Sequence, residues 1–377
     1  MKIILILQKK IMPDHPKKTK LPPLFIINAT IGFRNFLLKT AAGMLPATYV
    51  MLEEASKVWK VKAIEIAASL NIAGHLKQQP LSVDQLAGLT GTDADALYRV
   101  LRALAGEGIF KELPGRVFKN TRLSLAIAPQ KDSVKYFSMH HIGETNWALT
   151  GDMTYCVKTG KNAFEHKFNT TPFEHLAVHP DENDIFNKAM TETAELSGSI
   201  MADSYPFGKY KTIVDIGGGQ GLLLAQILDK HPGPTGILFD QPHVVASAKE
   251  HLADNKLQNR CTITEGSFFD ALPVTCDLYI LKNIIHDWND QDSQRILKNV
   301  HHYMPGGARL LLIETIIKAD NKPSFGKFID LQMLIGTQGG RERTRDEFTA
   351  LLNDSGFRIT KIINNATPFS FIEAVKK

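Results

Sequence analysis

Short apolar runs of strand-forming residues alternate with helical stretches from Thr212 to the end of the chain, and this pattern limits the possible folds most strongly. Strands buried on both faces of a parallel sheet appear as continuous apolar runs, and each parallel pair needs a helical crossover. We therefore expect an α/β domain with a mostly parallel, seven-stranded sheet. The expected strands cover residues 213–216, 236–239, 261–264, 278–281, 310–313, 357–363 and 369–374.

A glycine-rich segment follows the first expected strand. The strand carries Asp215 near its end, and the run from Gly217 to Gly221 leads into a helical stretch. Glycines let the backbone turn tightly and let a ligand approach it near the helix N-terminus. The nicotinamide fingerprint G-x-G-x-x-G fails in both frames, because Leu222 and Leu224 stand where its third glycine is required. A different nucleotide-like cofactor is favoured.

A carboxylate at the end of the second expected strand supports this interpretation. Asp240 lies 23 residues after Gly217, where an acidic side chain can accept hydrogen bonds from both hydroxyls of a ribose. The alternative is a glycine-rich turn beside an unrelated acid. Because both features fall in one βαβ unit, we favour a ribose site.

The amino-terminal half has helical patterns instead. One apolar stripe extends over residues 45–76, and short helices are expected over 82–88 and 93–106, followed by hairpin strands over 109–113 and 117–121. Two helices and a hairpin in this order predict a winged-helix domain. We expect a disordered basic tail (1–23), a helical winged-helix domain (24–130), a helical linking layer (131–207) and the sheet domain (208–377).

Charge and cysteine content exclude several classes of protein. The net charge of +5 equals that of the first twenty residues, which hold six lysines and one aspartate, so it is weak support for nucleic acid or membrane partners. Translation could start at Met1 or Met12. The three cysteines are widely spaced, which predicts neither a disulfide framework nor a zinc cluster. We expect a cytoplasmic protein without a metal ion, a signal peptide or a membrane span.

Five short motifs follow one another in the second half of the chain. They are V-D-I-G-G-G-x-G from Val214, F-D-Q-P-H-V from Phe239, L-K-N-I-I-H-D-W from Leu281, P-G-G from Pro305 and E-R-T from Glu342. Together they resemble the metal-independent small-molecule O-methyltransferases, which include caffeic acid, hydroxyindole and bacterial polyketide O-methyltransferases. The resemblance implies an S-adenosylmethionine cofactor, a Rossmann-like catalytic domain and a homodimer formed through the winged-helix domain.

The resemblance also assigns residues to the cofactor. It places Gly217 against the cofactor, Asp240 on its ribose and Phe268 near its adenine. Many relatives have an aspartate where this chain has Ser267, and an uncharged contact to the adenine amine predicts weaker binding. The expected cofactor-binding residues are Asp215, Gly217, Gly219, Asp240, Ser267, Phe268 and Lys282.

The resemblance implies that the methyl group goes to a hydroxyl of a small aromatic acceptor. A phenol with a pKa of about 10 is mostly protonated at neutral pH, so a general base is expected. His286 follows the fourth strand, at the edge where open α/β sheets bind ligands. Glu314 ends the fifth strand and can hold the second ring nitrogen. The resemblance places Glu314 and Glu342 on either side of His286. For Asp287, contact with the acceptor and capping of the next helix remain equally open.

Apolar side chains of the linking helices and the late loop are expected to hold a flat aromatic acceptor. The candidates are Met139, Trp147, Phe186, Met190, Leu331 and Met333, of which the resemblance favours Met190 and Met333. Such stripes are also typical of an ordinary helical core.

Three other functions are alternatives to O-methyl transfer. N-methylation would use the same geometry, and some relatives hydroxylate or decarboxylate aromatic polyketides after losing the base. A winged-helix DNA-binding regulator is disfavoured, because residues 81–110 carry four acidic side chains against two arginines. O-methyl transfer is the prediction that fits His286 and its two glutamates best.

Overall fold

The computed structural model describes residues 23–245, 248, 257 and 259–377. The predicted basic tail lies outside the described residues, apart from Pro23. The chain divides into two compact units, Met1–Ser56 and Lys57–Lys377. The first unit holds helix α2 (Leu24–Gly43) and the first part of α3 (Ala47–Ser69), and no side chain of α2 is buried. Large apolar side chains are exposed along these helices, among them Phe25, Phe33, Phe36, Met44, Met51 and Leu52.

A winged-helix fold opens the second unit. Helix α5 (Val83–Thr90) begins with a capping box, because Ser82 and Gln85 each accept a hydrogen bond from the other's main-chain N–H. Helix α6 (Ala94–Gly106) is capped by Asp93. Strands β2 (Phe110–Leu113) and β3 (Val117–Asn120) form the expected hairpin, which β1 (Leu81–Ser82) extends. The short helices α4 (Ile72–His75) and α7 (Arg122–Leu125) complete it.

A layer of helices connects the winged helix to the sheet. It consists of α8 (Lys135–Ile142), α9 (Glu144–Gly151), α10 (Met153–Thr159), α11 (Ala163–Phe168), α12 (Pro172–Val178) and α13 (Pro180–Ser204). The predicted helical character of this layer is seen, and Gly143 separates α8 from α9. A Cβ atom at Gly143 would lie 2.3 Å from the Met139 carbonyl oxygen, so glycine permits the close turn between α8 and α9. The boundaries of the four expected segments stay predictions.

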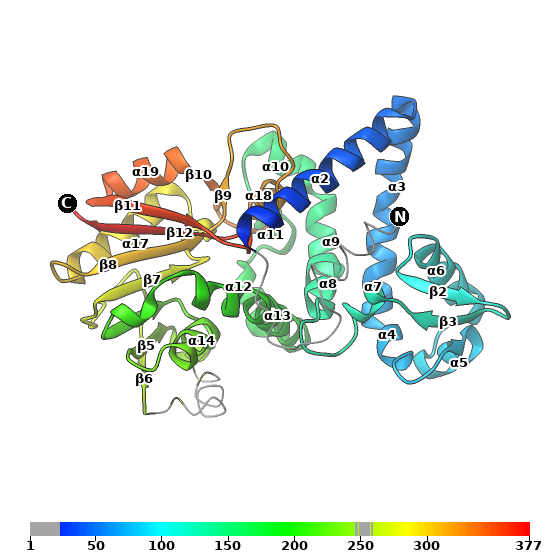
Figure 1. Cartoon of the computed structure of the whole chain (residues 1–377), viewed down its shortest axis with the longest axis horizontal. Coiled ribbons are helices and arrows are strands. Elements are labelled where there is room, and N and C mark those ends of the chain that lie inside the picture. Colours follow the sequence, from blue (N-terminus) through cyan, green and yellow to red (C-terminus); the bar gives the residue numbers. More distant parts are fainter. Residues whose placement is uncertain (1–22, 246–247, 249–256, 258) are drawn as a thin grey trace. The chain divides into compact units, whose positions relative to one another are not determined.

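The predicted seven-stranded sheet is confirmed, with the order β11-β12-β8-β7-β4-β5-β6 (Figure 1). Five strands are parallel, and β12 runs antiparallel between β8 and β11. The strands are β4 (Thr212–Ile216), β5 (Thr235–Asp240), β6 (Cys261–Glu265), β7 (Leu278–Lys282), β8 (Arg309–Glu314), β11 (Phe357–Asn364) and β12 (Ser370–Lys376).

Helices cover both faces of the sheet. Because side chains alternate along a strand, Tyr279 and Leu281 of β7 join one core with α17 (Asp290–Tyr303) and α19 (Arg345–Asp354). Leu278 and Ile280 join the opposite core with α14 (Leu222–Lys230). The remaining short elements are η1 (Phe207–Lys209), α15 (Pro242–Val245), η2 (Ile285–Asp287), β9 (Ile316–Ile317), α18 (Phe325–Gly336) and β10 (Arg343–Thr344).

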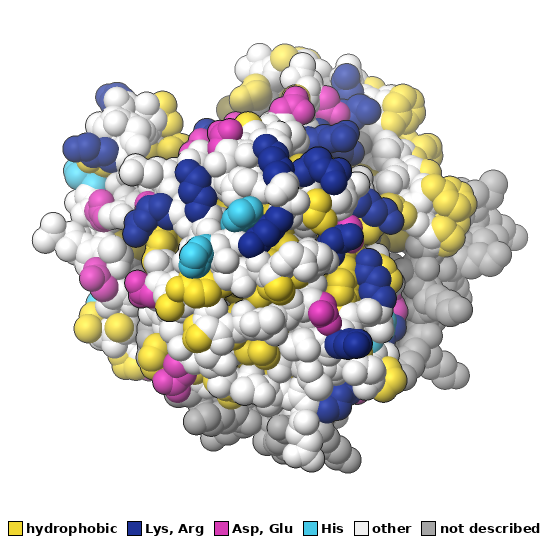
Figure 2. All heavy atoms as spheres, turned by 90° about the vertical axis from the view of Figure 1, so that its left-hand side faces the viewer, with side chains coloured by type: hydrophobic (Ala, Val, Ile, Leu, Met, Phe, Trp, Pro, Cys, Tyr) yellow, Lys and Arg dark blue, Asp and Glu magenta, His cyan; other side chains and the backbone are white. Residues whose placement is uncertain are grey.

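The chain order reverses at β4, which lies between β7 and β5. Ligands of open α/β sheets bind at the carboxyl ends of the strands beside such a switch point. On the face in Figure 2, Lys and Arg side chains lie among apolar and acidic ones and form no unbroken basic surface over the described residues. None of the helices among the described residues is long and apolar enough to span a membrane.

Candidate active site

The glycine loop after β4 has the tight geometry that its sequence predicted. Gly217, Gly219 and Gly221 have φ angles of 68°, 60° and 77°, which L side chains rarely adopt. A Cβ atom at Gly217 would lie 2.4 Å from Cδ1 of Ile284, whereas a Cβ atom at Gly219 would meet nothing within 4 Å. The loop therefore packs against the segment after β7 on one side and stays open at Gly219.

Asp240 is joined directly to this loop. Its Oδ2 accepts a hydrogen bond from the Gly219 N–H at 2.8 Å, and its Oδ1 accepts one from the Gln241 N–H at 2.7 Å. These bonds fix the carboxylate at the end of β5 beside the open face of the loop. This is the arrangement that a ribose diol needs.

Asp215 is buried behind the loop, and Lys282, the half-buried last residue of β7, places a positive charge near it. Burial, and to a smaller extent Asp240, raise the pKa of Asp215, whereas the charge of Lys282 lowers it. The resulting pKa is about 7. Burial also lowers the pKa of Lys282, against the attraction of Asp215 and Glu314. Oδ1 of Asp215 has no hydrogen-bond partner among the described residues. A buried acceptor of this kind fits a ligand that carries a hydrogen-bond donor.

Phe268 lies close to the glycine loop, as expected for a residue near an adenine. Its Cε1 would be 3.6 Å from a Cβ atom at Gly217, and its ring meets Trp288 edge-on with centroids 5.9 Å apart. Oγ of Ser267 accepts the Phe269 N–H at 3.2 Å. The hydroxyl that replaces the family's aspartate is thus also part of a local turn.

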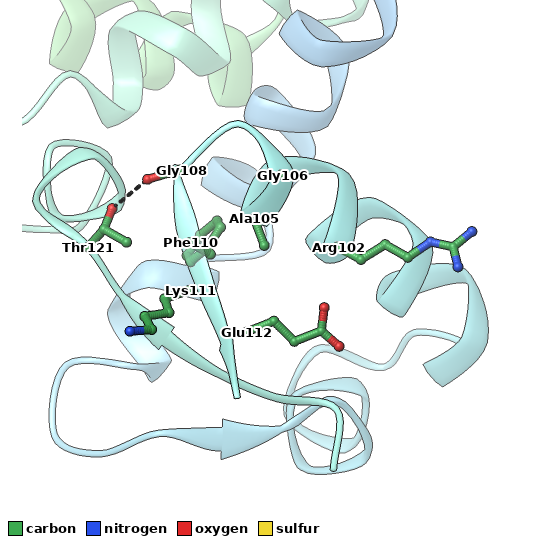
Figure 3. Close-up of a pocket in the computed structure, with 8 residues that line it drawn as sticks. All are labelled: Arg102, Ala105, Gly106, Gly108, Phe110, Lys111, Glu112 and Thr121. Carbon is green, nitrogen blue, oxygen red and sulfur yellow. Dashed lines mark hydrogen bonds between the residues drawn. The ribbon is translucent and has the colours of Figure 1, made fainter. Parts of the chain in front are cut away.

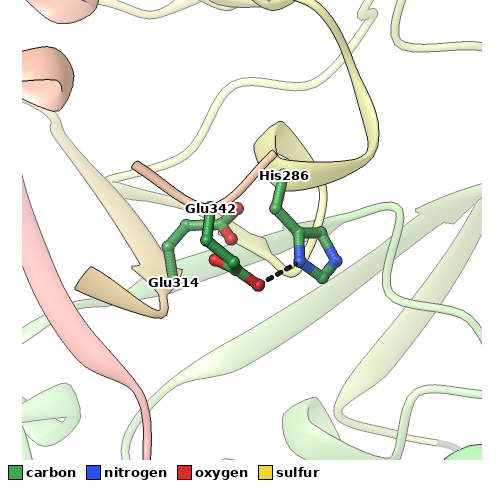
Figure 4. A group of neighbouring side chains, drawn as sticks. All are labelled: His286, Glu314 and Glu342. Atoms are coloured by element: carbon green, nitrogen blue, oxygen red, sulfur yellow. Dashed lines mark hydrogen bonds and ion pairs between the residues drawn. The ribbon is translucent and has the colours of Figure 1, made fainter. Parts of the chain in front are cut away.

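His286 lies in η2, directly after β7. Its Nδ1 is 2.9 Å from Glu342 Oε1 (Figure 4), and its Nε2 is 3.4 Å from Asp287 Oδ1. With Nδ1–H donated to the carboxylate, Nε2 is the ring atom that can exchange a proton with a bound molecule. Asn289 rather than Asp287 caps α17, so the capping alternative for Asp287 is wrong.

Two short strands bring Glu342 to the histidine. β9 follows β8 almost at once, and β10 pairs with it in parallel, so that Arg343 lies opposite Ile316. This pairing places Glu342 beside Glu314, the last residue of β8. Oε1 of Glu314 accepts the N–H groups of Ile284 and Ile285 at 3.1 and 2.9 Å. Both glutamates therefore lie at the histidine loop, as predicted.

The three carboxyl groups determine the protonation of the imidazole. Burial lowers the pKa of His286, but Asp287, Glu342 and Glu314 together raise it to about 10. Burial raises the pKa of Asp287, and it raises that of Glu314 to about 7, while the charge of His286 lowers both. The cluster thus stabilises a positive charge on the ring, which is the form a base reaches after accepting a proton.

His286, Glu314 and Glu342 also have the donor types of a metal site, with one ligand atom of each within 4.8 Å of the others. Here Nδ1 is engaged by Glu342, and Oε1 of Glu314 is engaged by two main-chain N–H groups. Carboxylates that orient a ring and its loop in this way are typical of a general base.

The expected acceptor residues divide into two groups. Met333 is buried in α18, one turn from Asp330, whose Oδ1 accepts the Glu342 N–H at 2.9 Å. Trp147, Phe186 and Met190 lie in the helical layer, and no hydrogen bond, ion pair or ring contact among the described residues joins them to His286. Among these candidates, Met333 is linked to His286 indirectly, through Asp330 and Glu342.

Two surface hollows lie outside this cluster. One, of about 560 Å³, is on the winged helix and is lined by Arg102, Lys111, Glu112 and Thr121 among others (Figure 3). The other, of about 280 Å³, lies between α8, α9 and α18 and is lined by His141, Leu331 and Gln332 among others. Leu331 was an acceptor candidate, so the second hollow lies on the expected acceptor side.

Sequence patterns missed two residues that hold Glu342 and His286 together. Asp330 gave no signal, because it lies in a helix whose other residues are mainly apolar. Gly340 was also missed, although a Cβ atom there would lie 2.6 Å from the His286 carbonyl oxygen. The run Gly339-Gly340 just before Glu342 was the available signal for this close approach.

The chain is similar to known methyltransferases over most of its length. Residues 151–358 match the model of an O-methyltransferase domain, and residues 52–128 match that of an O-methyltransferase dimerisation domain. Phenazine O-methyltransferase PhzM of Lysobacter antibioticus is 37% identical over 334 residues, which cover 88% of this chain and 97% of that protein.

Solved structures are similar over the same length. The crystal structure of LaPhzM has a TM-score of 0.84 and 36% identity, and the match covers 88% of this chain and 100% of that one. An O-methyltransferase from neocarzinostatin biosynthesis, in complex with S-adenosylmethionine and 2-hydroxy-5-methyl naphthoic acid, has a TM-score of 0.75 and 26% identity, with 85% and 96% covered.

Replacing Glu342 with Gln should lower the pKa of His286. The carboxylate stabilises the charged ring, and removing an adjacent opposite charge typically shifts a pKa by about 1 to 3 units. Side-chain NMR titration measures this value, with the His286 signal assigned from its loss in His286→Ala. Glu347→Gln is the matched control, since Glu347 caps α19 in the same segment. An unchanged His286 pKa in Glu342→Gln would contradict the assigned electrostatics.

Proposed function

Because the chain belongs to the O-methyltransferase family, we propose that His286 is the general base for methyl transfer to a hydroxyl of a small aromatic acceptor. The cofactor is S-adenosylmethionine, and the family acts without a metal ion. The observation that carries the proposal is the imidazole held by Glu342 at the sheet edge beside the glycine loop.

The cofactor-side residues fit S-adenosylmethionine. Asp240 presents its carboxylate beside Gly219 for the ribose, and Phe268 supplies an aromatic edge for the adenine. Asp215 supplies a buried acceptor, and Lys282 a cation, for the charged amino-acid end. When bound, this cofactor supplies a methyl group that is already electrophilic.

The protein's task is to prepare the acceptor oxygen. When the acceptor oxygen takes the methyl group, whose bond to the cofactor's sulfur would break to leave a neutral thioether, the hydroxyl proton passes to Nε2 of His286, and Nδ1–H remains donated to Glu342. The resulting imidazolium is stabilised by Glu342, Asp287 and Glu314. Its pKa of about 10 is close to the pKa of about 10 of an ordinary phenol, so the proton moves between groups of similar basicity.

Apolar side chains support an aromatic acceptor. Met333 is buried one helical turn from Asp330, which holds the Glu342 main chain, and Leu331 and Ile335 on the same helix line a hollow with His141. Burial lowers the pKa of His141, so its ring is neutral at neutral pH. The names of relatives also contain aromatic acceptors, since they include a phenazine O-methyltransferase and a naphthoate O-methyltransferase.

A homodimer formed through the dimerisation domain completes the proposal. Exposed aromatic and aliphatic side chains crowd the helices before the winged helix, and Trp59 of α3 is 73% exposed. An apolar surface of this kind on a single chain is typical of a self-association face.

His286→Ala should lower kcat by about 10²- to 10⁴-fold, because it removes the proton acceptor and leaves the cofactor site intact. Turnover is measured with methyl-labelled cofactor and a panel of phenols, naphthols and anilines, and cofactor affinity by calorimetry. His302→Ala, an exposed residue of α17, is the control. Wild-type turnover in His286→Ala would overturn the base, and labelling of anilines alone would replace O-methylation by N-methylation.

The pH dependence of kcat/KM follows from the raised pKa of His286. Below about pH 10 the free ring carries a proton, so the enzyme and an ordinary phenol together must release one proton to the solvent before Nε2 can accept the hydroxyl proton. We expect kcat/KM to rise by up to about tenfold per pH unit from neutral pH toward pH 10. An electron-poor phenol already ionised at neutral pH should show a flat profile. A rise ending near pH 6.5 for the ordinary phenol would contradict the raised pKa.

Trp59→Asp should weaken the dimer, because a charge in an apolar interface is desolvated without a partner. Sedimentation over a range of protein concentrations measures the dimer fraction. Phe173→Asp is the control, since Phe173 is a similarly exposed aromatic residue on α12. A wild-type chain that stays monomeric throughout would contradict the proposed dimer.

A further inference from the structure

Arg343, the residue after Glu342, has no direct role in the proposed proton transfer. It begins β10, and its side chain is completely buried. A guanidinium keeps its charge in proteins, and burying it is costly unless its N–H groups find acceptors. The partners of this side chain therefore show what its burial achieves.

The guanidinium donates hydrogen bonds to main-chain oxygens on both sides of His286. Nη1 donates to the Ile285 carbonyl at 2.9 Å, and Nη2 donates to the Trp288 carbonyl at 2.9 Å. Nε and Nη2 also donate to Oδ1 of Asp290, at 3.0 and 2.8 Å. One side chain thus holds the start, the middle and the end of the segment from 285 to 290.

Other groups hold the parts of this segment that Arg343 does not reach. Glu314 accepts the N–H groups of Ile284 and Ile285, and Glu342 binds the imidazole. The Ile285 and Trp288 carbonyl oxygens accept the shorter bonds from Arg343 and longer ones, of 3.3 Å each, from the Ser293 hydroxyl. Arg343 is the charged group among these donors.

We propose that Arg343 is a positioning residue for methyl transfer, which fixes the main chain of residues 285–290 so that His286 meets Glu342 and the acceptor oxygen together. The inference rests on the proposed role of His286 as the base. No contact of Arg343 involves the glycine loop, Asp240 or Lys282. Its effect should therefore appear in kcat rather than in cofactor binding.

Lysine is the informative substitution. Arg343→Lys keeps the charge but replaces the planar fork with one nitrogen, which cannot reach two carbonyls and Asp290 together. Since a displacement of about 1 Å in a catalytic group can cost about 10²-fold, we expect kcat to fall between about 10- and 100-fold. The KM for each substrate and the cofactor Kd should change less than about threefold.

Arg341 provides a matched control. Its Nη2 donates to Oδ2 of the same Asp290 at 2.8 Å, but it is 44% exposed and its side chain makes no hydrogen bond to a carbonyl of the described 285–290 segment. Arg341→Lys should keep kcat within about twofold, because an exposed ion pair contributes little. An equal loss of kcat in both variants would show that either arginine near Asp290 has the same effect, and would overturn a specific role for Arg343.

The decisive measurement repeats Arg343→Lys in a His286→Ala background. A residue that acts through His286 has nothing to position once the imidazole is gone, so residual turnover should not fall further. A loss of the same size in both backgrounds would indicate a general structural role and would overturn positioning. Wild-type kcat in Arg343→Lys beside an inactive His286→Ala would overturn positioning alone. Full activity of His286→Ala would instead refute the proposed base.

Folding is checked by thermal unfolding and by cofactor binding. If Arg343→Lys fails to bind cofactor, Asp290→Ala takes its place, since it removes the carboxylate that Nε and Nη2 share and leaves the arginine present. We then expect a smaller loss of kcat, again absent in the His286→Ala background. Wild-type kcat in Asp290→Ala would overturn the proposal.

Discussion

A single imidazole surrounded by three carboxyl groups is the constraint on which the rest of the site depends. Carboxylates this close together repel one another and are costly to bury, so each must be held by hydrogen bonds or by the charge on His286. Glu314 is held by two main-chain N–H groups and Glu342 by the ring. The ring in turn has a raised pKa, and the cluster is built for a positive charge at its centre.

The fold brings these groups together through short-range register. β7 and β8 are neighbours in the sheet, so His286 and Glu314 follow adjacent strand ends. Glu342 lies 56 residues after His286 in the sequence, so another structural element must bring it to the ring. The two-residue pairing of β9 and β10 does so, because β9 starts two residues after Glu314 and β10 starts one residue after Glu342.

The parts of the site that lie at strand ends could be predicted from the sequence. All seven strands, the glycine loop and the place of His286 followed from apolar runs and glycine spacing, because burial and backbone conformation leave marks in local sequence. Glu342 was reached only through resemblance, since a two-residue strand has no periodicity. Asp330 and Arg343 act through tertiary contacts that no local pattern records.

The loop after β7 also couples the base to the cofactor side. Lys282 ends β7, His286 follows four residues later, and Asn283 between them takes a φ of 53°, which turns the chain sharply. Ile284 then packs where a side chain on Gly217 would otherwise lie, so the glycine is required by the base loop as well as by a ligand. This close contact therefore fixes the loop of His286 against the glycine loop. A larger residue at 217 would disturb both sites at once.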